Sequence, residues 1–166
     1  MKWNDRIKSF LVAAMVIPTT NLTDWKIEQF SRVPKNEVTA SAKGLLIRIN
    51  GSAGPLIYPL KAKTKITGFK ISGEFLGLPK FANSSLQGEK GFDDYPLRVG
   101  FVVPGEKRLS GLKKMFVAQW VKRLYEQVQD GTGLDSVRFY NVTQNTKQVG
   151  QTRIHPASDL FHEEFF

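Results

Sequence analysis

Apolar and polar residues alternate along the first half of the chain, and this period of two predicts short β-strands. Glycine and proline residues separate the alternating segments, as they do at turns between strands. The predicted strands cover residues 25–30, 37–42, 45–50, 56–60 and 61–75. Several short strands before any helix favour an antiparallel β-sandwich or jelly roll.

One segment of the second half has a helical period instead. Apolar residues recur every fourth position from Leu112 to Val128, and lysine, arginine and glutamine residues occupy the other side. The pattern predicts an amphipathic α-helix at about 111–129, between strands at 97–103 and 137–142. This succession could form a parallel crossover. Because no helices separate the earlier strands, we expect a mainly β fold, an antiparallel β-sandwich or jelly roll with one inserted helix.

The amino terminus has the layout of a secretory signal. A positively charged start precedes a short apolar run, Phe10 to Ile17, which is too short to span a bilayer as a helix. We therefore expect a signal-like leader at 1–20, a single β-sandwich domain at 21–166 and a periplasmic or secreted protein. The alternative is that the first residues form a helix or strand of the domain. No other segment reaches membrane-spanning length, so no transmembrane span is expected.

Composition bears on partners more than on chemistry. Lysine and arginine exceed aspartate and glutamate and give a net charge of +9, which favours anionic partners such as acidic glycans. Nucleic acid is not expected, because aromatic residues do not alternate with the basic ones on exposed strands. The chain has no cysteine, which excludes disulfides, thiol nucleophiles and cysteine-based zinc sites.

Three stretches together resemble a group of exported bacterial proteins of unknown function. They are residues 93–100, with an acidic pair before an arginine-containing strand, the helical segment 119–125 and the strand 137–142. Residues 54–60 fit the same picture. The resemblance implies a jelly-roll sandwich similar to sugar-binding modules, and it implies no catalytic residues.

The acidic pair Asp93 and Asp94 is the sharpest polar feature of the sequence. Adjacent carboxylates in a turn could bind Ca²⁺ or accept hydrogen bonds from sugar hydroxyls. The alternative is a structural turn in which one aspartate caps backbone amides and the other pairs with Arg98. Asp93, Asp94 and Arg98 are therefore candidate ligand-binding residues, and calcium is the one cofactor that they suggest.

A second candidate surface is basic. Lys61, Lys63 and Lys65 alternate, so in a strand they would project from one face and form a ridge for anions. The alternative is that they protect an edge strand, for which lysine is commonly used. Residues 77–90 form the longest irregular connection and are expected to be a functional or mobile loop.

The two histidines do not form a recognisable metal or catalytic motif. His155 and His162 are seven residues apart, and this spacing matches no zinc motif. No Gly-x-Ser-x-Gly motif for a hydrolytic serine occurs.

Three functions remain open from the sequence. The first is a non-catalytic binding module for a glycan or another anionic component of the cell envelope. The second is an envelope interaction or assembly protein. The third is a glycan-acting hydrolase or lyase that uses Asp93, Asp94 and His155. The sequence does not indicate an oligomeric state.

Overall fold

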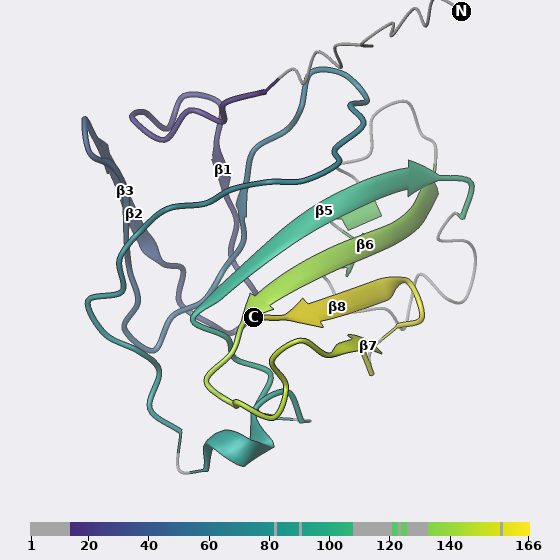
Figure 1. The fold of residues 1–166 in the computed structure, drawn as a ribbon. Coiled ribbons are helices and arrows are strands. Elements are labelled where there is room, and N and C mark those ends of the chain that lie inside the picture. The colour runs from purple at the N-terminus through teal and green to yellow at the C-terminus, as the bar shows by residue number, and fades with distance from the viewer. Residues whose placement is uncertain are drawn as a thin grey trace, which may run out of the picture. The chain divides into compact units, whose positions relative to one another are not determined.

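The computed structural model is mainly β (Figure 1). It describes residues 14–81, 83–89, 91–107, 121–122, 124–125, 133–156 and 158–166. The chain divides into two compact units, one up to Lys63 and one from Thr64 onward. Most of the predicted leader lies outside the described residues, and the expectation of a single domain at 21–166 stays a prediction.

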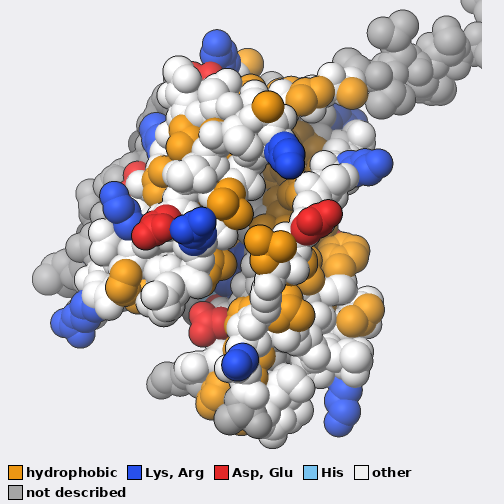
Figure 2. All heavy atoms as spheres, turned by 90° about the vertical axis from the view of Figure 1, so that its left-hand side faces the viewer, with side chains coloured by type: hydrophobic (Ala, Val, Ile, Leu, Met, Phe, Trp, Pro, Cys, Tyr) orange, Lys and Arg blue, Asp and Glu red, His pale blue; other side chains and the backbone are white. Residues whose placement is uncertain are grey.

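The first unit contains two small antiparallel sheets. Strands β1 (Lys26–Ile27) and β4 (Leu56–Ile57) form one pair, and β2 (Glu37–Ser41) and β3 (Gly44–Arg48) form a hairpin. The hairpin turns at Gly44, whose φ of 119° suits glycine. Several apolar side chains of this unit stay exposed, among them Leu46, Ile47 and Ile49. Hydrophobic groups accordingly appear among the charged ones on the face in Figure 2.

The second unit is built on a four-stranded mixed sheet. Its strands are β5 (Leu97–Gly105), β6 (Gly133–Val142), β7 (Thr152–Ile154) and β8 (Phe161–Phe165), in the order β5-β6-β8-β7 (Figure 1). The β5–β6 and β7–β8 pairs are antiparallel, and the β6–β8 pair is parallel. The last strand therefore lies between two earlier ones.

Side chains alternate between the two faces of this sheet, and one face carries the core. This inner face includes Val137 and Phe161, which pack with Val121, Leu134 and Leu160. The outer face carries Arg138, Tyr140, His162 and Glu164, according to the strand register. Phe69 packs edge-on against Tyr140 at 4.9 Å on this outer face. The inner face thus combines an apolar core with charged side chains such as Glu163, and the outer face carries aromatic as well as charged side chains, such as Phe101 opposite Arg138.

Two predicted elements are not confirmed, the strand at 61–75 and the helix at 111–129. Residues 61–75 are irregular and not a strand, because an alternating pattern keeps a chain extended but supplies no neighbouring strand to pair with. Most of the predicted helix at 111–129 lies outside the described residues, although Val121, Lys122, Leu124 and Tyr125 have helical backbone. Within the described part of the chain, no helix is long and apolar enough to cross a membrane.

The predicted loop 77–90 contains one turn of 3₁₀-helix, η1 (Ser84–Leu86). Asn83 caps this turn, because its side chain accepts a hydrogen bond from the backbone N–H of Ser85 at 3.0 Å. The next residue, Gln87, is almost fully buried. This end of the loop is therefore anchored in the second unit.

Candidate ligand site

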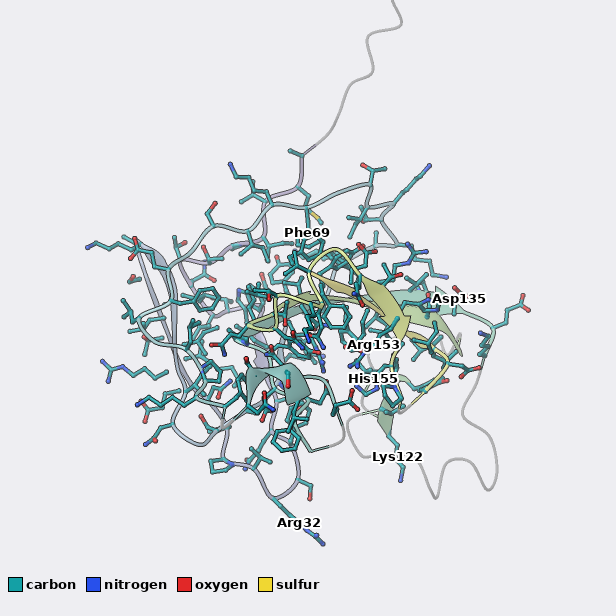
Figure 3. The ribbon with its side chains drawn as sticks, turned by 60° about the horizontal axis from the view of Figure 1, so that its bottom comes forward. Arg32, Phe69, Lys122, Asp135, Arg153 and His155 are labelled. Carbon is teal, nitrogen blue, oxygen red and sulfur yellow. The ribbon has the colours of Figure 1, made fainter. Side chains whose placement is uncertain are left out.

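Charged side chains meet on the inner face of the four-stranded sheet, beside the apolar core. We call this cluster the charge network; its members are Asp93, Arg98, Asn141, Arg153, His155 and Glu163. Each strand of the sheet supplies at least one member, and Asp93 comes from the turn before β5. Arg153 and His155 lie close together in Figure 3.

Glu163 is the centre of the charge network. Its side chain is fully buried, and it pairs with Arg98 at 3.1 Å and with Arg153 at 2.7 Å. The amide of Asn141 donates a third hydrogen bond, at 2.9 Å. A buried carboxylate is costly unless it is paired and hydrogen-bonded, and both oxygens of Glu163 meet that condition.

Asp93 lies at the partly exposed rim. It forms a two-point ion pair with Arg98, at 2.8 and 3.3 Å, and a hydrogen bond of 2.9 Å with Nε2 of His155. Burial by itself would raise the pKa of Asp93, but the hydrogen bonds from His155 and Arg98 outweigh it and hold the pKa below 3.8. Asp93 is therefore ionised at neutral pH.

Aromatic rings enclose the two guanidinium groups. The rings of Tyr95 and Phe139 lie 4.9 and 5.1 Å from the Arg98 guanidinium carbon, and Phe165 lies 5.3 Å from that of Arg153. These contacts are favourable because a cation is attracted to the face of an aromatic ring. Burial raises the pKa of Tyr95 to about 12, so its hydroxyl stays protonated.

The buried side chain of Gln87 forms hydrogen bonds to two loops of the second unit. Its side-chain oxygen accepts hydrogen bonds from Thr143 and from the backbone N–H groups of Gln144 and Asn145. Its side-chain nitrogen donates to the carbonyl of Asp94 at 2.7 Å. One buried side chain thus joins the loop before β5 to the loop after β6.

Gly88 packs directly against the network. Its φ is 90°, and an added Cβ would lie 2.5 Å from Tyr95 Oη. Gly91 is a matched control, because its φ is 86° and an added Cβ would meet no atom within 4 Å. We expect Gly91→Ala to cost about 1 kcal/mol of unfolding free energy from backbone strain, and Gly88→Ala about 1 to 2 kcal/mol more. Urea unfolding of both variants measures the difference, and equal losses would contradict the close contact.

The carboxylates of the charge network do not suit a metal ion. Asp93, His155 and Glu163 each place a potential ligand atom within 4.8 Å of the others. However, Arg98 and Arg153 already occupy these carboxylates, and a divalent cation would have to displace or face two positive charges. The calcium site suggested by the acidic pair therefore finds no support in this geometry.

A depression of about 320 Å³ lies against β6, β8 and β7. Its lining comes from three neighbouring strands and consists of Arg138, Thr152, Arg153, Ile154, His162, Glu163 and Glu164. Arg138 and His162 are register partners in the parallel β6–β8 pair. Among the described residues, none forms an ion pair with Arg138, His162 or Glu164.

The structure separates the predicted site residues. Asp93 and Arg98 meet in the charge network, and the backbone carbonyl of Asp94 receives the hydrogen bond from Gln87. The lysines at 61, 63 and 65 are exposed but lie on irregular backbone, so strand geometry does not align them as a ridge. Arg153 and Glu163 were not predicted, although a glutamate between Phe161 and Phe165 on one face was a readable signal.

No family model, no curated protein and no solved structure matches the chain.

Proposed function

We propose that this chain is an exported, non-catalytic β-sandwich module that binds a glycan of the cell envelope. The observation that carries the proposal is the depression against β6, β8 and β7 of the four-stranded sheet. The resemblance to exported, sugar-binding-like proteins supports the compartment and the jelly-roll form of the sandwich.

The lining of the depression suits a sugar. The side chains of Arg138 and Thr152 donate hydrogen bonds, and Glu164 accepts them, so vicinal hydroxyl groups of a sugar find both kinds of partner. Ile154 is half exposed and offers an apolar surface to the C–H groups of a sugar ring. Ligand sites commonly combine a few polar groups with an apolar wall in this way.

Binding of envelope polysaccharides to the full chain tests the proposal. We expect saturable binding that Arg138→Ala weakens about tenfold, because a hydrogen bond to a charged group is lost. Arg48→Ala is the matched control, since Arg48 is an exposed arginine on a strand of the first unit. The proposal fails if no polysaccharide binds at millimolar concentration, or if both variants weaken binding equally.

The hydrogen bond between Asp93 and His155 favours a second candidate, a glycan-acting hydrolase or lyase. A carboxylate that orients an imidazole is a common arrangement for acid–base catalysis. In the same polysaccharide mixtures, release of reducing ends or of unsaturated sugars would support this candidate. If the mixtures show binding but no turnover, the hydrolase or lyase is excluded and the non-catalytic binding module is supported.

A further inference from the structure

One loop of the second unit exposes several large apolar side chains. We call residues 70–80 the apolar loop; its backbone is irregular, and every residue in it except Pro79 is exposed. Leu76 has 88% of its surface exposed, and Ile71, Phe75 and Leu78 have half or more. Large apolar side chains that gather on a surface in this way mark a place where a protein or a membrane binds.

Both ends of the apolar loop are held by the second unit. The ring of Phe69, directly before the loop, lies 5.1 Å from the ring of Phe101 and 4.9 Å from that of Tyr140 (Figure 3). At the other end, the side-chain amide of Gln144 donates a hydrogen bond of 3.0 Å to the carbonyl of Pro79. Between these points the loop is not packed, because a Cβ atom added to either glycine of the loop would meet no described atom within 4 Å. The loop is therefore fixed at its ends and open to solvent between them.

Positive charge borders the apolar loop. Lys70 begins it and Lys80 ends it, and neither forms an ion pair with another described residue. The lysines at 61, 63 and 65 precede the loop in the chain, so residues 61–80 hold five lysines and a single acidic residue, Glu74. The irregular backbone does not align these lysines, but attraction to a charged surface requires no alignment.

We infer that the apolar loop binds the surface of a membrane that contains anionic lipids. The lysines attract the negatively charged head groups, and the apolar side chains enter the boundary between head groups and acyl chains. The backbone of the loop then stays among the hydrated head groups, where water satisfies its N–H and C=O groups. The carbon stems of Lys70 and Lys80 lie along the apolar boundary while their ammonium groups reach the head groups.

The side chains of the loop suit a lipid surface better than nucleic acid or another protein. Nucleic-acid bases stack on aromatic rings, but Ile71, Leu76 and Leu78 are aliphatic. The centres of protein–protein interfaces are depleted of lysine, whereas lysine is favourable beside anionic head groups. The net charge of +9 on the whole chain attracts an anionic membrane at longer range. The apolar loop shares no residue with the lining of the glycan depression, so this inference does not rest on the proposed function.

Flotation of the full chain with lipid vesicles tests the inference. The probes are vesicles of phosphatidylglycerol and phosphatidylcholine in equal amounts, and vesicles of phosphatidylcholine alone. We expect binding to the anionic vesicles only, and weaker binding as the salt concentration rises. The double variant Phe75→Ser with Leu76→Ser should lose about tenfold or more in affinity, because two apolar side chains no longer enter the acyl boundary. Ile49→Ser with Val149→Ser is the matched control, since it removes two exposed apolar side chains elsewhere in the chain and should bind like the wild type. Both double variants are expected to keep the wild-type unfolding midpoint, because the replaced side chains are exposed.

A second pair of variants tests the charge of the loop. Lys70→Gln with Lys80→Gln should weaken binding to the anionic vesicles about tenfold, because two lysines beside the head groups are lost. Lys43→Gln with Lys147→Gln removes the same charge from exposed positions elsewhere in the chain and should have a smaller effect.

Several outcomes would overturn the inference. They are no binding to anionic vesicles, equal binding to neutral ones, wild-type binding by the double serine variant of the loop, and equal losses in the two lysine pairs. If that serine variant instead abolishes binding of a single-stranded oligonucleotide, the loop is a nucleic-acid surface, and if it abolishes a dimer, the occupant is a second copy of the chain. Arg138→Ala should leave vesicle binding intact, which separates this test from that of the glycan depression.

Discussion

Glu163→Gln is expected to lower the unfolding free energy of the second unit by about 3 to 5 kcal/mol, because two partly buried guanidinium groups lose their shared counter-charge. The glutamine would also place an N–H₂ group where Arg98 or Arg153 now donates. Urea unfolding, followed by the fluorescence of the aromatic residues, measures the loss.

Glu164→Gln is the matched control for this change. Glu164 is the next residue on the same strand, but its side chain belongs to the outer face. Glu164→Gln removes the same charge as Glu163→Gln. We expect it to change the unfolding free energy by no more than about 0.5 kcal/mol. Similar losses for the two variants would mean that net charge, and not the buried ion pairs, sets the stability.

Gln87→Ala is expected to have the second largest effect, a loss on the order of 3 kcal/mol. The substitution leaves the part-buried backbone N–H of Gln144 without its acceptor, and the backbone N–H of Asn145 keeps only the hydroxyl oxygen of Thr143 as an acceptor. It also removes the donor to the carbonyl of Asp94. Hydrogen exchange should be faster at 144, whose amide loses its acceptor, and less so at 145, whose amide keeps Thr143.

Gln151→Ala removes a side chain of the same type for comparison. Gln151 is exposed, and its side chain donates a hydrogen bond to the carbonyl of Lys147. We expect little change in stability and none in exchange at 144 and 145. If Gln87→Ala behaved in the same way, the loop before β5 would not depend on the buried glutamine.

Local sequence patterns predicted many of the strands. The segments 37–42, 45–50, 97–103 and 137–142 correspond to β2, β3, β5 and β6, since alternation and turn residues act over a few positions. The strands β7 and β8 were not predicted. Their charged residues at Arg153, Glu163 and Glu164 conceal the apolar alternation of Phe161 and Phe165, and nothing local indicates that β8 runs parallel to β6.

The candidate site was predictable only in part, because local sequence patterns do not show which distant strands pair. Asp93 and Arg98 are five residues apart, so a turn followed by a strand can bring them together, and the structure shows this ion pair. Arg153 and Glu163 join them through the strand order and the register of β8 between β6 and β7. Such long-range pairing depends on the whole sheet, and a single sequence gives no measure of it.

The position of β8 also has a consequence for synthesis. Residues 152–154 leave the ribosome before residues 161–165, yet β7 can join the sheet only through β8 (Figure 1). Until then Arg98 and Arg153 lack the carboxylate of Glu163, and the inner faces of β5 and β6 lack Phe161. The nascent chain therefore carries an unfinished sheet with uncovered apolar residues, a form that chaperones and proteases recognise until residue 165 is in place.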